Sequence, residues 1–268
     1  MMITAVPKIS VLVPVYNAEM FICDTINAVL NQTFQNFELI LLNDASTDKT
    51  AECIAKYQDP RIVYLENKQN LGIAASRNKL IAAARGEYIA VLEHDDICLP
   101  QRLEIQLDFF NKHPEISMAG SWFELFSPSS TPWFKRFIIN AGWVWCHPQR
   151  PTLTDARKGN VLMHPTIMYR RKDFEQHNIR YSSEMSPAED YHLVYQALKK
   201  GLRLANIPQI LLKYRLYGGN CSIKRKKQMK LADKKIKRLI YADLNIPFRF
   251  LYPYWLVILQ KLRLKFML

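Results

Sequence analysis

The sequence lacks both of the glycine-rich loops that commonly bind nucleotide phosphates in proteins of alternating strands and helices. Neither GxGxxG nor GxxxxGK[ST] occurs among its 268 residues, and glycine occurs only 8 times. A Rossmann dinucleotide site and a P-loop need these glycines because the backbone must approach the phosphates closely. The sequence therefore argues against both kinds of nucleotide site.

Cysteine pairs and an N-terminal targeting segment are also missing. The 5 cysteines are scattered, odd in number and without a CxxC pair, which argues against a disulfide framework and a structural zinc site. Residues 1–15 have no positively charged stretch before their apolar run and are more typical of a first strand than of a signal peptide. We therefore expect a globular protein that stays in the reducing cytoplasm.

Acidic residues become scarce toward the C-terminus. From residue 199 onward the chain contains 18 Lys or Arg residues and only 2 acidic ones, which gives a net charge of +16. The preceding residues carry a net charge of −3. This asymmetry predicts a basic tail that meets an anionic surface and a body with separate chemistry. We accordingly divide the chain into a domain of residues 1–221 and an extension of residues 222–268.

Strand-like and helix-like segments alternate through the first half. Buried-type strands are expected at 8–17, 37–46, 61–67 and 87–96, and helices between them at 19–31, 47–57 and 72–85. This order predicts an α/β fold with a mostly parallel central sheet and helices on both faces. Ligands of such sheets gather beyond the carboxyl ends of the strands.

The second half is less regular. We expect a helix at 99–112, strands at 116–126 and 166–171, and a helix at 186–201. The last helix has a capping-box signature in which Ser186 is the N-cap, Pro187 is N1 and Glu189 is N3. Residues 127–160 show no clear periodicity, and a long irregular segment of this kind is often a functional loop, so acceptor contacts are expected there.

The fourth expected strand ends in the acidic stretch VLEHDD. Carboxylates this close together resist burial unless a cation neutralises them, so the stretch predicts a divalent metal site. The alternative is an acidic loop before the next helix, where acidic residues favour the helix N-terminus. Strand alternation would place Glu93 and Asp95 on one side and His94 on the other, as a packing or hydrogen-bonding residue.

Several motifs together resemble family 2 glycosyltransferases of the nucleotide-sugar-binding GT-A type, such as those of bacterial lipopolysaccharide and capsule synthesis. In chain order they are ISVLVPVYNAE, ELILLNDASTDKT, NLGIAASRNKLIAAARGEYIAVLEHDD, MHPTIMYRR, AEDYHL and LLKYRLYGGNCS. The resemblance implies an inverting transferase that moves a sugar from a nucleotide diphosphate donor, here expected to be a UDP-sugar. The expected acceptor is a saccharide or a lipid-linked sugar of cell-surface polysaccharide or lipopolysaccharide biosynthesis.

The resemblance also implies roles for residues after the first two strands. Asp44 matches the aspartate that hydrogen-bonds the donor base, and Pro14, Tyr16 and Asn17 would form the wall beneath that base. The alternative for Asp44 is a turn or N-cap residue before the helix at 47–57.

Two acidic motifs carry the remaining implied roles. Glu93 and Asp95 stand at the place of the family's DxD motif, in which the last aspartate coordinates Mn²⁺ or Mg²⁺ on the donor diphosphate. Glu93 departs from the motif with a longer side chain of the same charge, which affects its contact to ribose or metal. The resemblance implies that Asp190 is the general base. Alternatively, Asp190 is an ordinary acidic residue in the first turn of the helix at 186–201, where the helix dipole favours it. Arg215 matches the closing segment over the diphosphate, where it would neutralise phosphate.

Two other functions compete with this interpretation. A nucleotidyltransferase shares a similar sheet and a carboxylate-bound metal, but usually opens with a glycine-rich, Arg-containing loop that PVYNAE does not resemble. A non-enzymatic nucleic-acid binder would explain the basic tail but not the strands that end in acids. We therefore expect no nucleic-acid partner.

The tail combines cations with aromatic side chains. Its apolar run, 250–259, is too short to span a bilayer, but aromatic rings beside basic residues are typical of a segment at a membrane interface. The alternative is a C-terminal helix packed on the domain with solvated Lys and Arg side chains. We expect peripheral attachment to an anionic membrane surface at the inner face of the cell membrane.

Overall fold

The first half of the chain forms a parallel sheet. The computed structural model describes residues 6–129, 131–139, 144–145 and 147–247. Four strands lie in the spatial order β3-β2-β1-β4 and pair in parallel. They are β1 (Ile9–Val15), β2 (Phe37–Asn43), β3 (Ile62–Glu66) and β4 (Tyr88–Val91). Their carboxyl ends therefore meet at one edge, as the alternating pattern predicted.

The second half continues the same sheet with mixed directions. The strands are β5 (Ile97–Cys98), β6 (Ile116–Phe126), β7 (Val144–Trp145), β8 (Met168–Arg170) and β9 (Arg203–Arg215). β8 lies between β4 and β6 and is antiparallel to both, while β6 and β9 pair in parallel. The parallel character of the sheet thus belongs mainly to its first four strands.

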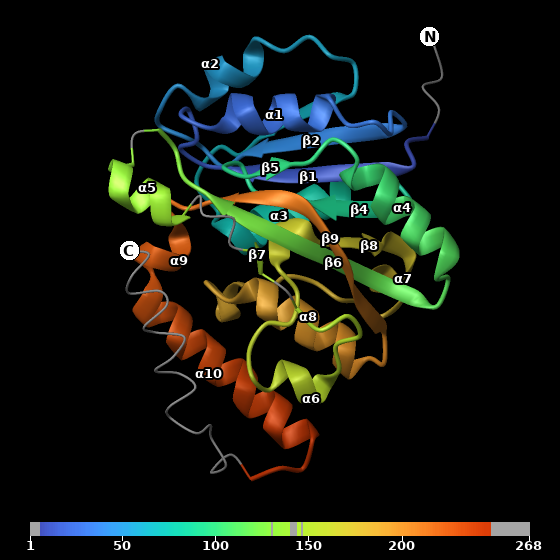
Figure 1. The fold of residues 1–268 in the computed structure, drawn as a ribbon. Coiled ribbons are helices and arrows are strands. Elements are labelled where there is room, and N and C mark those ends of the chain that lie inside the picture. The colour runs from blue at the N-terminus through green and yellow to red at the C-terminus, as the bar shows by residue number, and fades with distance from the viewer. Residues whose placement is uncertain (1–5, 130, 140–143, 146, 248–268) are drawn as a thin grey trace.

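Helices cover both faces of the sheet (Figure 1). On one face the core includes α1 (Ile22–Leu30), α2 (Thr50–Ala55) and α4 (Arg102–Lys112). On the other it includes α3 (Ile73–Ala83), α7 (Arg171–Gln176) and α8 (Glu189–Lys199). Alternation along the strands supplies both cores: in β2, Ile40 and Leu42 face α3 and α8, while Leu39 and Leu41 face α1.

The acidic stretch lies in a turn and not on a strand. β4 ends at Val91, and the Asp96 amide donates to the Glu93 carbonyl across the turn. The expected strand over 87–96 is therefore too long, and strand alternation does not apply to Glu93, His94 and Asp95. β4 ends where its parallel pairing with β1 ends, at Val91 opposite Leu12.

The segment at 127–160 contains regular structure that the sequence reading missed. It includes α5 (Trp133–Ile139), β7 and α6 (Leu153–Ala156). Thr152 and Asp155 form a capping box at the start of α6. The capping box expected at Ser186 is wrong, because α8 begins at Glu189 with Ala188 as its N-cap and without a side-chain cap.

In the described part of the chain, two helices follow β9. They are α9 (Cys221–Lys224) and α10 (Lys226–Asp243), and α10 packs against α8 and α6. Ala232, Ile236 and Ile240 of α10 are buried in the same core as α8. The apolar run expected at the membrane, 250–259, lies outside the described residues. Within the part of the chain that the structure describes, no helix has the length and apolar character needed to cross a bilayer.

Candidate active site

The ends of β1 and β2 form one wall of the candidate site. The Asn17 amide donates to Ser46 Oγ at 2.9 Å, and Asn17 Oδ1 accepts from the Thr47 amide at 2.8 Å. Asn17 has a φ of 48°, a left-handed conformation that Asn tolerates better than most residues. Tyr16 beside it is 44% exposed, so its ring is free to meet a ligand, whereas Pro14 is buried.

Asp44 holds the loop that leads into α3. Its Oδ1 accepts from Asn67 Nδ2 at 2.7 Å and from the Leu71 amide at 2.9 Å, and its Oδ2 accepts from the Gly72 amide at 3.0 Å. The side chain is nearly buried, at 4% exposure. Asp44 is not the N-cap of α2, because that position is Lys49. Asp44 therefore fixes residues 67–72 around the crevice.

The acidic turn is held from both sides. His94 Nδ1 lies 3.2 Å from the Pro14 carbonyl oxygen, which ties the turn to β1 and gives His94 the hydrogen-bonding role expected of it. Arg215 Nε donates to the Asp95 carbonyl at 2.7 Å, and the Arg215 amide donates to Asp96 Oδ1 at 2.9 Å. Arg215 is 5% exposed and also pairs with Asp24 at 2.9 Å. The expectation that Arg215 neutralises phosphate is thus replaced by a role in bracing the turn.

The turn carries negative charge that the protein leaves poorly compensated. Burial, together with nearby Glu93, raises the pKa of Asp95, and burial beside Asp95 raises that of Asp96 well above its ordinary range. Asp96 Oδ2 is buried without a hydrogen-bond partner. A divalent cation at Asp95 would relieve this charge, and carboxylate oxygen is the ligand type that Mn²⁺ and Mg²⁺ favour. The residues present therefore fit such a cation.

The protein supplies few ligands for that cation. Across the described residues, no group of three or more His, Cys, Asp or Glu side chains is arranged to hold a metal ion. A cation at Asp95 would therefore take most of its ligands from a bound diphosphate and from water, as Mg²⁺ commonly does.

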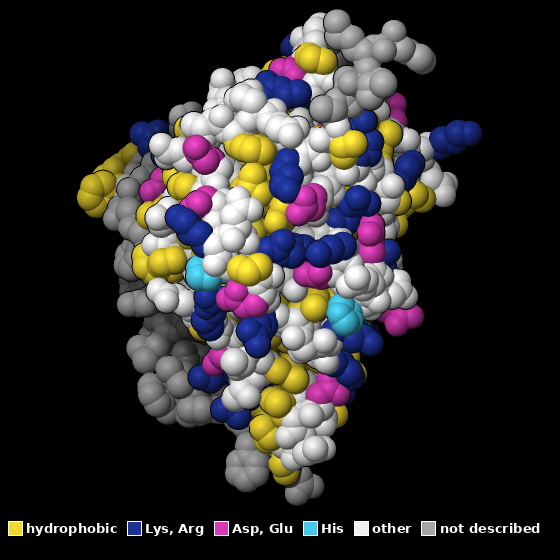
Figure 2. All heavy atoms as spheres, turned by 90° about the vertical axis from the view of Figure 1, so that its right-hand side faces the viewer, with side chains coloured by type: hydrophobic (Ala, Val, Ile, Leu, Met, Phe, Trp, Pro, Cys, Tyr) yellow, Lys and Arg dark blue, Asp and Glu magenta, His cyan; other side chains and the backbone are white. Residues whose placement is uncertain are grey.

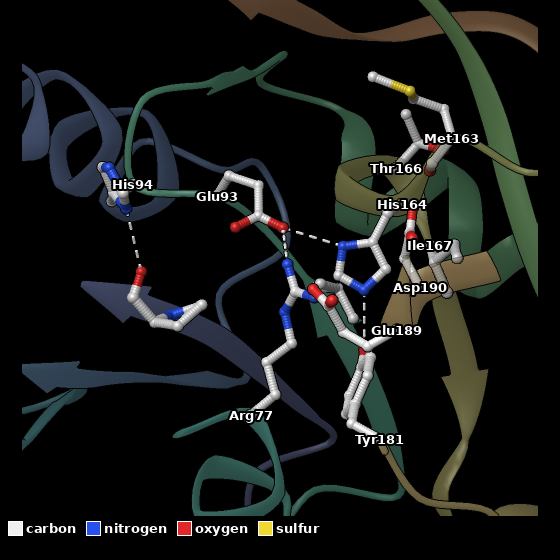
Figure 3. A network of polar contacts seen from close by, with 12 residues as sticks. Arg77, Glu93, His94, Met163, His164, Thr166, Ile167, Tyr181, Glu189 and Asp190 are labelled. Carbon is white, nitrogen blue, oxygen red and sulfur yellow. Dashed lines mark hydrogen bonds and ion pairs between the residues drawn. The ribbon is translucent and has the colours of Figure 1, made fainter. Parts of the chain in front are cut away.

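Glu93 points into a buried network with Arg77 and His164 (Figure 3). Its Oε1 accepts from Arg77 Nη2 at 2.5 Å and lies 2.9 Å from His164 Nδ1. His164 Nε2 lies 2.8 Å from the Tyr181 hydroxyl. Burial opposes ionisation of Glu93, but Arg77 and the hydrogen bond with His164 lower its pKa well below the usual range.

The same arginine reaches the start of α8. Arg77 Nη1 pairs with Glu189 Oε1 at 2.7 Å, so one guanidinium joins two carboxylates. Burial alone would lower the pKa of Arg77, but Glu93 and Glu189 raise it above its ordinary value. Asp190, the next residue of α8, accepts from Asn160 Nδ2 at 3.2 Å and is only partly buried. Asp190 is therefore the carboxylate of the pair that remains accessible.

Sequence reasoning missed four members of this site. The sequence patterns assign no role to Arg77, Asn160, His164 or Tyr181. The contacts of Arg77 with Glu189 and of His164 with Glu93 span 112 and 71 residues, so no local pattern marks them. The only local signal is His164 before Pro165, at the start of the 3₁₀ turn His164–Thr166.

The fold and the site together define a class of protein. A parallel α/β half with acids at its strand ends, joined to a mixed half that presents a carboxylate on a helix start, is the GT-A arrangement of glycosyltransferases. Residues 10–177 match the family model of glycosyl transferase family 2. The chain belongs to glycosyl transferase family 2.

Relatives in sequence cover most of the chain. An uncharacterized glycosyltransferase of Haemophilus influenzae is 31% identical over 87% of this chain and 72% of its own length. A putative teichuronic acid biosynthesis glycosyltransferase of Bacillus subtilis is 32% identical over 87% and 90%. An Escherichia coli UDP-Glc:alpha-D-GlcNAc-diphosphoundecaprenol beta-1,3-glucosyltransferase, WfgD, is 30% identical over 83% and 82%.

Solved structures share the fold at low sequence identity. S. aureus TarS 1–349 in complex with UDP-GlcNAc matches with a TM-score of 0.67 and 20% identity, over 88% of this chain and 66% of that chain. A mannosyltransferase from Pyrobaculum calidifontis in complex with GDP-Man and Mn²⁺ matches with a TM-score of 0.64 and 16% identity, over 88% and 65%. These matches support the GT-A fold.

Proposed function

We propose that this glycosyltransferase transfers a sugar, with inversion, from a UDP-sugar to a saccharide or lipid-linked acceptor of cell-surface polysaccharide or lipopolysaccharide. The observation that carries the proposal is the division of the site. Asp44 directly follows β2, and Asp95 lies in the turn after β4. Asp190 lies at the start of α8, where its neighbour Glu189 is joined through Arg77 to Glu93 of that turn (Figure 3). The Escherichia coli relative named for a UDP-glucose donor and a diphosphoundecaprenol acceptor supports this choice of substrates.

The parallel half would bind the donor. Asp44 would accept a hydrogen bond from the base, which would lie on Pro14, Tyr16 and Asn17. Asp95 would hold Mn²⁺ or Mg²⁺, and the bound cation would neutralise charge on the departing diphosphate. Glu93 is left with Oε2 for a donor contact, since Oε1 is taken by Arg77 and His164.

Asp190 would act as the general base. Its carboxylate would take the proton of the acceptor hydroxyl while that oxygen forms a bond to the anomeric carbon. The bond from the anomeric carbon to the diphosphate oxygen breaks on the opposite side, so the configuration inverts. Asn160 holds one oxygen of Asp190 and leaves the other available for this proton.

A donor panel tests the reaction. The purified protein is incubated with UDP-glucose, UDP-galactose or UDP-N-acetylglucosamine and Mn²⁺, and slow hydrolysis is followed by NMR. We expect one donor to release UDP and a sugar of inverted anomeric configuration. Retention of configuration would contradict the mechanism, and synthesis of a UDP-sugar from UTP and a sugar phosphate would favour the nucleotidyltransferase alternative.

We further propose that a surface formed by α5 and α10 attaches the enzyme to an anionic membrane. Trp133, Phe134 and Phe137 of α5 are 77%, 50% and 76% exposed. The exposed side chains of α10 include a row of cations: Lys226, Lys227, Lys230, Lys234 and Lys235. Exposed aromatic rings beside cations are suited to lipid headgroups, and each cation contributes on the order of 1 kcal/mol near an anionic leaflet.

α5 and α9, the short helix before α10, follow two strands whose ends are joined. The Leu216 amide donates to the Phe126 carbonyl, which joins the end of β9 to the end of β6, and α9 and α5 follow these strands. Figure 1 shows α5 beside α9. Figure 2 shows the face on the right-hand side of Figure 1, where Lys and Arg side chains are mixed with Asp and Glu. The lipid-linked acceptor would then approach from the side of α5.

Vesicle co-sedimentation tests this attachment with the full chain. Replacing Lys230, Lys234 and Lys235 by Glu should release the protein from vesicles containing phosphatidylglycerol, as should high salt. Lys112→Glu and Lys172→Glu, on α4 and α7, are controls that should not. Equal recovery of all variants in the supernatant would exclude the membrane role, and binding to duplex DNA instead would favour the nucleic-acid alternative.

A further inference from the structure

The first acid of the acidic turn is linked to the acceptor side of the site, directly by His164 and through Arg77 to Glu189. Both protein contacts of Glu93 fall on Oε1, one from Arg77 at 2.5 Å and one with His164 at 2.9 Å. Arg77 continues to Glu189 at 2.7 Å, the residue before Asp190. Glu93, Arg77 and Glu189 thus form a continuous bridge between the turn that holds Asp95 and the start of α8 (Figure 3).

We propose that Glu93 is a positioning residue, which acts through Arg77 and Glu189 to set the distance between Asp95 and Asp190. This inference rests on the proposed function, in which Asp95 serves the donor and Asp190 the acceptor. The contribution of Glu93 is then expected to be larger in the rate of transfer than in donor affinity, even if its Oε2 also meets the donor. A positional error of about 1 Å between reacting groups can cost on the order of 100-fold in rate.

The length of the glutamate is what allows the bridge. An aspartate at this position would draw the carboxylate back by one carbon–carbon bond, about 1.5 Å. The carboxylate oxygens of the aspartate would then lie roughly 4 Å from the Arg77 and His164 nitrogens, beyond the hydrogen-bond range. The departure of Glu93 from the DxD motif is accordingly the feature that the network requires.

Burial makes the bridge sensitive to each of its members. Arg77, His164 and Glu189 are 7%, 4% and 5% exposed, so water cannot replace a lost partner. Buried charges persist only when they are paired and hydrogen-bonded. With a neutral imidazole, Nδ1–H donates to the Glu93 carboxylate, and Nε2 accepts from the Tyr181 hydroxyl, which fixes the ring.

Glu93→Asp is the decisive substitution, because it restores the usual residue of the motif. We measure UDP affinity by calorimetry, kcat for hydrolysis of the UDP-sugar consumed fastest by wild type, and the melting temperature. We expect the UDP Kd to stay within about threefold of wild type and kcat to fall by about tenfold or more.

Glu38→Asp is the matched control. Glu38 is also buried, at 2% exposure, and binds Ser10 Oγ at 2.7 Å and Arg85 at 2.8 Å, but it lies at the opposite end of β2 from Asp44. The Glu38→Asp substitution should lower the melting temperature and leave the UDP Kd and kcat close to the wild-type values. A merely structural role of Glu93 would give the same pattern as Glu38 and would overturn the inference.

Tyr181→Phe tests the bridge if Glu93→Asp does not fold. It removes only the hydroxyl that fixes His164, and we expect kcat to fall a few-fold, about threefold, with an unchanged UDP Kd. Unchanged kcat in both variants, or a loss of UDP affinity in Glu93→Asp at unchanged kcat, would overturn the inference. A wild-type protein that neither binds UDP nor hydrolyses any UDP-sugar would instead overturn the proposed function.

Discussion

The two halves of the site are built by different means. In the donor half, residues 8–98, Asn17 and Asp44 lie within two residues of the ends of β1 and β2. Because these strands are parallel neighbours, their ends lie at one edge of the sheet. In the acceptor half, residues 116–247, Asp190 begins a helix that lies beyond an antiparallel strand and a long segment of mixed structure. Strand ends thus fix the donor residues, whereas long-range contacts fix the acceptor residue.

The contacts that cross between the halves are mostly charged. Arg77 of the donor half holds Glu189 of the acceptor half, and Arg215 of the acceptor half holds the turn with Asp95 and Asp96. Each arginine is buried, so its partners are held tightly. If the proposed roles hold, donor binding and catalysis are expected to respond to different substitutions, although the two halves are held together by buried charges.

The largest effect is expected at the junction of the halves. Asp95→Asn should lower kcat by about 1,000-fold or more, because a carboxylate that would serve the donor diphosphate loses its charge. The fold should persist, since burial disfavours the charge of Asp95. Turnover in Mn²⁺ and in excess EDTA, with circular dichroism as the folding control, checks this. Full turnover of wild type in EDTA would contradict the assignment.

An intermediate effect is expected within the acceptor half. Asn160→Ala removes the donor that lies 3.2 Å from Asp190 Oδ2, so the base loses orientation but keeps its carboxylate. We expect kcat to fall by roughly threefold to tenfold at an unchanged UDP Kd. Steady-state kinetics and calorimetry on one preparation check this. A weaker UDP Kd would place Asn160 in the donor half instead.

The smallest effect is expected where α10 meets α8. Burial alone would raise the pKa of Asp243, but hydrogen bonds from Tyr195 at 2.7 Å and Lys199 at 2.9 Å lower it. A lowered pKa adds stability above the ordinary value near 3.8, and that stability is lost as the pH falls through the folded value. Asp243→Asn should therefore destabilise the protein by up to about 1 kcal/mol at pH 7.

Urea unfolding at several pH values checks this sign. The difference in unfolding free energy between wild type and Asp243→Asn should stay nearly constant from pH 7 to about pH 5 and shrink as the pH falls below the ordinary value near 3.8. A difference that grows in acid would mean that the Asp243 carboxylate does not stabilise the α8–α10 contact.

The sequence predicted the donor half well because its information is local. Alternating strands and helices placed Asn17, Asp44 and the acidic turn at strand ends, and the resemblance to the family assigned the fold. The errors were also local: the capping box at Ser186 and the strand over 87–96 followed good patterns that tertiary contacts overrode. Glu189 faces Arg77 and does not cap α8, since pairing a buried charge outweighs a cap.

The acceptor half was harder to predict for a physical reason. Arg77 and Glu189 are 112 residues apart, and Asn160 and Asp190 are 30 apart. Neither pair can be found without knowing that β8 inserts between β4 and β6. Similarly, the role of Arg215 in bracing the turn depends on β9, which pairs with β5 directly after the acidic turn.

The central claim is that the donor half binds and the acceptor half reacts. The most direct test measures UDP affinity and kcat for Asp44→Ala and Asp190→Asn in parallel with wild type. We predict that Asp190→Asn keeps the UDP Kd and loses about 100-fold or more in kcat. Asp44→Ala should weaken UDP binding by about tenfold or more, since it also frees the loop at 67–72. Loss of UDP binding in Asp190→Asn, with normal binding in Asp44→Ala, would contradict the account.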